Sequence, residues 1–156
     1  MIELVTQSNI MEAAIVHSKS WKESHREICS ADFIAAHTPE RQKDYIETEM
    51  AKGARFYLLM DEKPIGIVSI QGSLISNLYV LPSEQNKGYG TQLLAFAVNH
   101  CSGTPSLWIL STNIGAKRFY ERNGFQTTGN TIQHSGDIIE LELRMIEDFN
   151  RSPLEK

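Results

Sequence analysis

The chain has 156 residues, a length typical of one domain that buries a substantial core without disulfides or metals. Its composition is 41% hydrophobic and 22% charged, which excludes an intrinsically disordered chain. The formal net charge of -4 argues against general binding to nucleic acid, which normally needs a basic face. No apolar run approaches the roughly 18 residues of a membrane span, and the first ten residues lack the pattern of a signal peptide. We therefore expect a cytoplasmic protein with no membrane partner.

Two cysteines, Cys29 and Cys101, give neither a disulfide framework nor a CxxC metal site. His25 and Cys29 have i, i+4 spacing, and His37 lies nearby in the sequence. A fourth ligand and a compact pattern are missing, so we expect no metal site.

The first half of the chain predicts a strand, then helices, then a run of strands. Thr38 is the expected N-cap of the helix predicted at 38–50, with Pro39 in its first turn. Tight turns separate three successive apolar runs, which predicts an antiparallel meander. The predicted elements are a strand at 2–5, a helix at 9–23, a short helix within 24–40, a helix at 38–50, and strands at 54–60, 65–71 and 74–80.

The second half predicts alternating helices and strands. Its elements are a helix at 91–101, a strand at 106–110, a helix at 113–123, a strand starting at 125–128 and a strand at 137–145. The order βααβββαβαββ, with mixed strand directions, indicates an α/β fold in which helices cover a central sheet. We expect a single domain over 1–146 and a polar C-terminal tail over 147–156.

The stretch QNKGYG places Gly88 and Gly90 directly before a predicted helix. The backbone N–H groups at a helix N-terminus accept anions, and glycines let an oxygen approach the backbone closely. Lys87 adds a charge and Thr91 a hydroxyl, so this stretch is a candidate phosphate site; a solvated turn is the alternative. A P-loop and a dinucleotide fingerprint both fail here, because the residues after Gly90 do not fit either pattern.

Two stretches of the sequence resemble motifs of one enzyme family. The segment 80–94, VLPSEQNKGYGTQLL, resembles motif A of the GNAT superfamily of acyl-CoA-dependent N-acyltransferases. The segment 111–125, STNIGAKRFYERNGF, is similar to its motif B. The element order also matches from Ile2 to about Met145. The resemblance implies a GNAT fold: a central mixed, mostly antiparallel sheet of about six to seven strands, with a splayed V-shaped cleft and helices on both faces. The matching positions are Gln85, Gly88 and Gly90 in motif A, and Asn113, Ala116, Phe119, Tyr120, Gly124 and Phe125 in motif B.

The resemblance also implies a site for acetyl-CoA as cosubstrate. The pyrophosphate of coenzyme A is expected on the motif A loop, and the pantetheine arm along the backbone of Leu78 to Val80. Asn113 is expected to hydrogen-bond that arm, and Tyr120 to lie near the sulfur. On helix 113–123, Lys117, Arg118 and Arg122 are read as a solvated face rather than as ligands of the 3′-phosphate. The implied coenzyme-binding residues are Leu78, Val80, Gln85, Asn86, Lys87, Gly88, Tyr89, Gly90, Thr91, Asn113 and Tyr120.

Few side chains are needed for the implied chemistry, because a thioester is already activated and positioning supplies much of the rate. Tyr120 is the expected general acid toward the departing thiolate, and the N–H of Val80 is expected to polarise the thioester carbonyl. A packed core aromatic is the alternative reading of Tyr120. The strand 74–80 has no carboxylate to act as base, so a water relay through Ser76 or Asn77 is one solution.

The acceptor is expected to be a primary amine of a small molecule, a peptide or a protein N-terminus. In the family the acceptor is recognised by the loop after the first helix and by the last hairpin, here 21–33 and 128–137. Two alternatives stay open: an acyl-CoA-binding regulatory module without turnover, and a subunit whose exposed sheet edge pairs with another chain, as in a homodimer. Candidate acceptor residues are Trp21, His25, Arg26, Asn77, His134 and Asp137, and a surface or packing role is the alternative for these positions.

Overall fold

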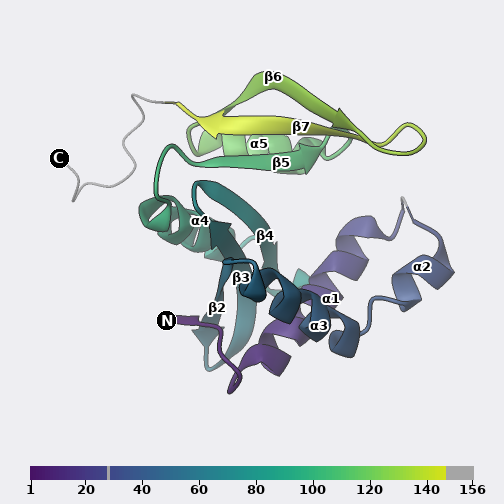
Figure 1. The fold of residues 1–156 in the computed structure, drawn as a ribbon, viewed down its shortest axis with the longest axis vertical. Coiled ribbons are helices and arrows are strands. Elements are labelled where there is room, and N and C mark those ends of the chain that lie inside the picture. Colours follow the sequence, from purple (N-terminus) through teal and green to yellow (C-terminus); the bar gives the residue numbers. More distant parts are fainter. Residues whose placement is uncertain (28, 147–156) are drawn as a thin grey trace.

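The structure is a computed structural model that describes residues 1–27 and 29–146 (Figure 1). The expected polar tail at 147–156 lies outside the described residues. None of the described helices is long and apolar enough to cross a membrane. The elements are β1 (Ile2–Leu4), α1 (Ile10–His25), α2 (Ala31–Ala35), α3 (Pro39–Ala51), β2 (Arg55–Asp61), β3 (Lys63–Gln71), β4 (Leu74–Val80), η1 (Pro82–Glu84), α4 (Tyr89–His100), β5 (Ser106–Leu110), α5 (Ile114–Arg122), β6 (Phe125–Gln133) and β7 (Ile139–Met145).

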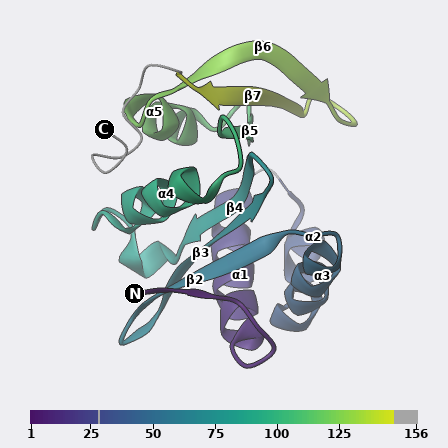
Figure 2. The same cartoon turned by 60° about the vertical axis from the view of Figure 1, so that its left-hand side comes forward.

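In the described part of the chain, seven strands form one sheet in the order β1-β2-β3-β4-β5-β7-β6. Strands β2, β3 and β4 form the predicted antiparallel meander, and β1 extends it. Only the β4–β5 pairing is parallel among the described strands, which confirms a mixed, mostly antiparallel sheet. Figure 2 shows β5, β7 and β6 turned away from the β1–β4 half.

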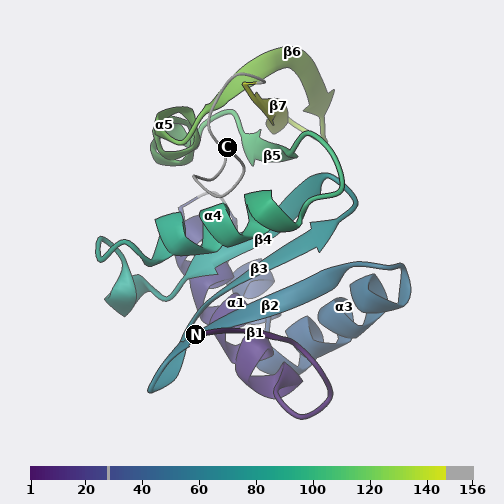
Figure 3. The same ribbon diagram turned by 90° about the vertical axis from the view of Figure 1, so that its left-hand side faces the viewer.

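Helices cover both faces of the β1–β4 half. Helices α1 and α3 pack together on one face, and α4 lies on the other against β3 and β4 (Figure 3). Two apolar clusters fill these layers, one on each face of the meander. Each fully buried leucine or isoleucine contributes about 1.5–3 kcal/mol through the hydrophobic effect. The residues of α4 that enter the core are Leu93, Leu94, Ala97 and Val98.

The sheet opens between β4 and β5. Within the described residues these strands share a single register pair, Leu74 with Ser106, and then diverge. Strand β4 also carries a β-bulge, because Asn77 and Leu78 together oppose Val68 of β3. Asn77 has a φ of 52°, a left-handed conformation that asparagine tolerates better than most residues. The bulge bends β4 at the point where the two halves of the sheet separate.

The second half differs from the predicted elements at β6. This strand, whose start was predicted at 125–128, continues to Gln133, and β7 begins at Ile139 rather than at 137. A bulge in β6 accommodates the glycine and asparagine at 129 and 130, with a φ of 95° at Gly129. The side chains of Thr128 and Asn130 donate to Glu142 of β7 at 2.8 and 2.9 Å, which stabilises the irregular pairing. The hairpin expected at 128–137 is therefore mostly strand.

Candidate active site

Two adjoining cavities lie where the sheet opens. The first has a volume of about 570 Å³ and lies against the loop before α4; we call it the loop cavity. The second has a volume of about 250 Å³ and lies between β4, β5 and the end of α1; we call it the strand cavity. Four residues line both cavities: Leu78, Asn113, Ala116 and Tyr120. The two cavities are therefore neighbouring parts of one cleft.

The loop cavity gathers ten of the eleven residues predicted to bind coenzyme A. They come from β4, from the loop and first turn of α4, and from α5. Lys87 is not among the described residues that line the cavity. Arg122, which sequence analysis assigned to a solvated face, does line it, with its guanidinium 6.0 Å from the centre of the Phe119 ring. The ten are Leu78, Val80, Gln85, Asn86, Gly88, Tyr89, Gly90, Thr91, Asn113 and Tyr120.

The two glycines of this loop have different roles. Gly88 is the N-cap of α4 and has a φ of 88°, which a side chain disfavours. Gly90 needs no such conformation, and a Cβ there would meet Phe119 only at 3.5 Å, an ordinary contact. The free protein thus has room for alanine at Gly90. A glycine there leaves the backbone N–H groups of the first turn open to the loop cavity, which fits an anionic group.

A buried carboxylate fixes the loop to the β2–β3 hairpin. Glu84 is only 6% exposed and pairs with Lys63 at 2.9 Å and Lys87 at 3.1 Å. These two lysines hold the pKa of Glu84 below its ordinary value. The Tyr89 hydroxyl donates to Asp61 Oδ2 at 2.7 Å, which adds a second connection to the same hairpin. Lys87 therefore contributes to the shape of the loop through Glu84.

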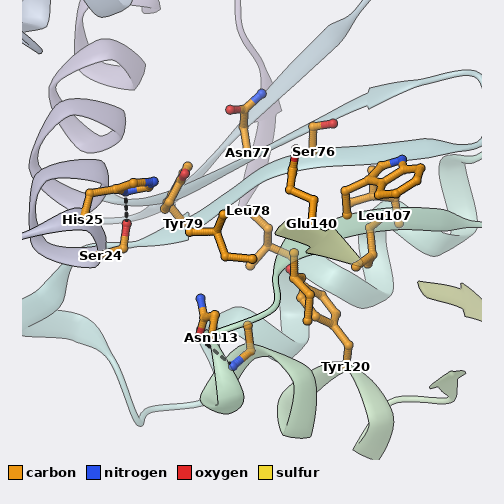
Figure 4. Close-up of a pocket in the computed structure, with 15 residues that line it drawn as sticks. Ser24, His25, Ser76, Asn77, Leu78, Tyr79, Leu107, Asn113, Tyr120 and Glu140 are labelled. Carbon is orange, nitrogen blue, oxygen red and sulfur yellow. Dashed lines mark hydrogen bonds between the residues drawn. The ribbon is translucent and has the colours of Figure 1, made fainter. Parts of the chain in front are cut away.

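Helix α5 supplies the residues at the junction of the cavities. Asn113 is its N-cap: Oδ1 accepts the N–H of Ala116 at 3.0 Å, and the amide nitrogen points away from the helix toward the Leu78 side (Figure 4). The Tyr120 ring packs edge-on against Phe119 and Phe125, and burial raises the pKa of its phenol to about 12. Tyr120 is thus both a packed aromatic and a protonated phenol that faces the cleft.

The strand cavity contains one carboxylate and one imidazole. Glu140 comes from β7 and its Oε1 lies 2.6 Å from His134 Nε2. His25 comes from the end of α1, and burial lowers the pKa of its imidazole. Sequence analysis missed Glu140. The signal was present in the alternating strand IELELRM, where Glu140 and Glu142 share a face.

The other predicted acceptor residues lie outside the strand cavity or turn away from it. Trp21 lies between the rings of His25 and His37, with centroid distances of 4.0 and 3.6 Å. Arg26 is exposed and pairs with Glu23 at 2.9 Å. Neither Trp21, Arg26, His134 nor Asp137 is among the described residues that line the strand cavity.

Asn77 lines the strand cavity, but its side chain points away from Leu78 into the layer of α1 and α3 (Figure 4). There Oδ1 accepts from His17 Nε2 at 3.0 Å, and Nδ2 donates to Ser69 Oγ at 3.0 Å. Gln42 donates to His17 Nδ1. His17 is 2% exposed, and burial lowers its pKa to about 4, so the imidazole is neutral. This polar network, also missed from the sequence, holds the bulged residue in place; its signal was a histidine four residues after Ala13 on the buried stripe of α1.

No group of three or more His, Cys, Asp or Glu side chains in residues 1–27 and 29–146 is arranged to hold a metal ion. Neither Cys29 nor Cys101 forms a disulfide within the described residues, and the Sγ of Cys101 donates to the Ser73 carbonyl oxygen at 3.7 Å. The cleft presents backbone N–H donors, a phenol, an amide, an imidazole and a carboxylate.

A family model described as an acetyltransferase (GNAT) domain matches residues 52–127, which contain the meander, the glycine pair and α5. This matching segment, just under half of the chain, is similar to GNAT acetyltransferase domains. No curated protein matches the sequence significantly.

Solved structures with the GNAT fold match over almost the whole chain. The PaiA N-acetyltransferase of Thermoplasma acidophilum, solved in complex with coenzyme A, is 20% identical and has a TM-score of 0.68, covering 91% of this chain and 98% of that chain. Apo YjaB of Escherichia coli is 17% identical with a TM-score of 0.71, covering 94% and 97%. A Corynebacterium glutamicum protein titled histone acetyltransferase HPA2 and related acetyltransferase is 16% identical with a TM-score of 0.72, covering 93% and 94%. At these identities the likeness shows the GNAT fold alone.

Proposed function

We propose that the protein is an N-acetyltransferase that moves the acetyl group of acetyl-CoA to a primary amine by direct attack in a ternary complex. The observation that carries this proposal is the pair of cavities that meet at Leu78 and Tyr120. One cavity has the backbone donors that suit a pyrophosphate, and the other has polar groups that suit an amine. A transfer reaction requires the acyl donor and the amine to meet at one point, which the junction of the two cavities provides.

In this proposal the N–H groups from Gln85 to Thr91 bind the pyrophosphate, with the guanidinium of Arg122 at the edge of the same cavity. The backbone from Leu78 to Val80 pairs with the pantetheine arm, and Asn113 offers it an amide donor. The coenzyme A in the PaiA structure supports the choice of cosubstrate, because that protein shares the fold over almost its whole length.

The two catalytic groups proposed are Val80 and Tyr120. The Val80 N–H polarises the thioester carbonyl as negative charge develops on its oxygen. Tyr120 donates a hydrogen bond to the departing sulfur. With a phenol pKa of about 12, Tyr120 is protonated at neutral pH and can donate its hydroxyl proton in a hydrogen bond.

The strand cavity supports a small acceptor group. A volume of about 250 Å³ admits a small amine or the terminal residue of a peptide, and Glu140 offers a carboxylate to an ammonium group. The lining residues include no lysine or arginine among those described. This lining favours a cationic amine over an acceptor that carries its own carboxylate beside the amine.

The test is release of free thiol from acetyl-CoA across a panel of amines, with coenzyme A binding measured in parallel by thermal shift. Thiol release above background with at least one amine, and a raised melting temperature with coenzyme A, are the expected results. A raised melting temperature with background release for every amine would replace the proposal with a coenzyme-binding regulatory module. The observation that favours such a regulatory module is that β4 carries no carboxylate.

A further inference from the structure

The strand cavity contains an imidazole with one ring nitrogen held by the protein and the other left open. His25 is the last residue of α1 and lines the cavity together with Tyr79, Asn113 and Tyr120. Its ring lies beside Tyr79 (Figure 4). Attack by the amine needs a proton acceptor. Strand β4 does not supply one, because Leu74–Val80 has no carboxylate.

Hydrogen bonds fix the tautomer of His25. Nδ1 lies 2.9 Å from the carbonyl oxygen of Trp21, which can only accept, so Nδ1 carries the proton. The Ser24 hydroxyl donates to the same carbonyl at 3.0 Å, and its oxygen also lies 2.8 Å from Nδ1 as a second acceptor. Nε2 is therefore the nitrogen with the free electron pair.

Nε2 of His25 points away from Ser24 in the direction of Tyr79 (Figure 4). No residue in the described part of the chain forms a hydrogen bond with it. The plane of the ring is fixed by stacking, since His25 and Trp21 are 4.0 Å apart at an angle of 10°, and Trp21 stacks in turn on His37. The imidazole is thus held in one orientation with its basic nitrogen available.

The charges around His25 favour the neutral, basic form. Burial lowers the pKa of His25 from 6.5, and the nearby His37 lowers it further, while the bond to Trp21 opposes these effects. The titratable groups near it are His37 across Trp21, His17 on the same helix, Tyr79 of β4, Tyr120 of α5 and Glu140 of β7. The exposed Glu23–Arg26 pair lies at the same end of α1.

We infer that His25 is the general base for the acceptor amine. The inference rests on the proposed function. As the neutral amine attacks, His25 Nε2 takes one N–H proton; the C–N bond forms, the C–S bond breaks, and the departing sulfur takes the phenol proton of Tyr120. The imidazolium proton returns to the phenolate through solvent, so an amine and a thioester give an amide and a thiol.

The experiment compares wild type, His25→Gln and His100→Gln with an amine that wild type acetylates. His100 is a matched control, because its Nδ1 binds the carbonyl four residues earlier at 2.8 Å and its ring stacks on Phe96 at 3.9 Å, at the end of α4. His25→Gln is expected to lower kcat about 100-fold, with the coenzyme A affinity unchanged. When kcat/KM is calculated for the neutral form of the amine, wild type and His100→Gln should share an acidic limb with a midpoint below 6.5. His25→Gln should lack this limb.

Two further measurements separate a base from a merely structural residue. Added imidazole should restore part of the rate of His25→Ala and should leave the rate of His100→Ala unchanged. Ring ¹⁵N NMR of the free protein should show the proton of His25 on Nδ1 at neutral pH. Two results would overturn the assignment of His25 as general base. One is that His25→Gln keeps the wild-type rate and the acidic limb of the pH profile; the other is that Glu140→Gln loses this limb instead. Failure of wild type to acetylate any amine would defeat the proposed function itself.

Discussion

The loop cavity and the strand cavity meet at Tyr120 and Leu78, yet they are built from different kinds of residue. The loop cavity depends on backbone groups that one short segment presents, Gln85 to Thr91, together with one helix. The strand cavity depends on side chains brought together from α1, β4, β5, α5 and β7. A backbone site suits a cosubstrate that many proteins share, whereas a side-chain site suits an acceptor that each protein selects. The two sides should therefore respond to mutation independently.

The largest expected effect is on the loop cavity. Gly90→Glu places bulk and negative charge where the proposed pyrophosphate lies, so coenzyme A affinity should fall by at least about 1,000-fold, about 4 kcal/mol. Isothermal titration calorimetry with coenzyme A measures the loss. Gln92→Glu is the control, because it adds the same charge at an exposed position of the same helix. Normal affinity in Gly90→Glu would remove the loop from the coenzyme site.

Tyr120→Phe tests the junction of the two sides. The phenol is proposed to act on the departing sulfur, so kcat should fall about 100-fold while the coenzyme A affinity changes little. Tyr57→Phe, a tyrosine 8% exposed in the core, provides the matched control. Steady-state kinetics with calorimetry separates the two parameters. Equal rates in Tyr120→Phe and wild type would show that Tyr120 only packs in the core and takes no part in the reaction.

The buried network behind β4 should appear as a pH dependence of stability. His17 has its pKa lowered to about 4, so the native state binds fewer protons than the unfolded state, where the value is 6.5. Its contribution is complete above pH 6.5 and is lost as the pH falls toward 4. From about pH 7.5 to about pH 5 the loss is roughly 2 kcal/mol.

Urea denaturation at both pH values measures that loss in wild type and in His17→Gln. The variant should be less stable at neutral pH and should lose less stability on acidification. His100→Gln, at an exposed site, should follow wild type. An identical pH dependence in His17→Gln and wild type would show that the network does not titrate.

The smallest effect is expected on the acceptor side. Glu140→Gln removes the carboxylate of the strand cavity, so the KM for a cationic amine should rise about tenfold, while the KM for acetyl-CoA is unchanged. Glu121→Gln, an exposed carboxylate on α5, is the control. An equal rise in both KM values would mean that the two sides are coupled rather than independent.

Sequence could predict the loop cavity because its determinants are local. The glycines at 88 and 90, Asn113 and Tyr120 are recognisable from short spacings along the chain. The fold followed from the same motifs and from apolar periodicity. The separate roles of Gly88 and Gly90 could not be predicted from the sequence, because they depend on the φ angle of Gly88 and on the distance from Gly90 to Phe119.

The strand cavity could not be assembled from sequence, because its residues meet only through strand register. Glu140 faces the cavity because β7 pairs with β5 in the register that sets it opposite Leu110. Asn77 was expected at the acceptor and instead faces His17, because the bulge reverses the side on which its amide lies. A one-residue shift of register changes the face of every side chain, and local patterns do not fix that register.

Coenzyme A is expected to bind in the cleft between β4 and α5, and NMR of ¹⁵N-labelled protein titrated with coenzyme A tests this directly. The amides of Gln85 to Thr91 and of Leu78 to Val80 should shift and saturate together. Those of α3, on the opposite face of the sheet, should stay in place. Shifts concentrated away from the loop cavity, or no saturable shifts, would contradict the account.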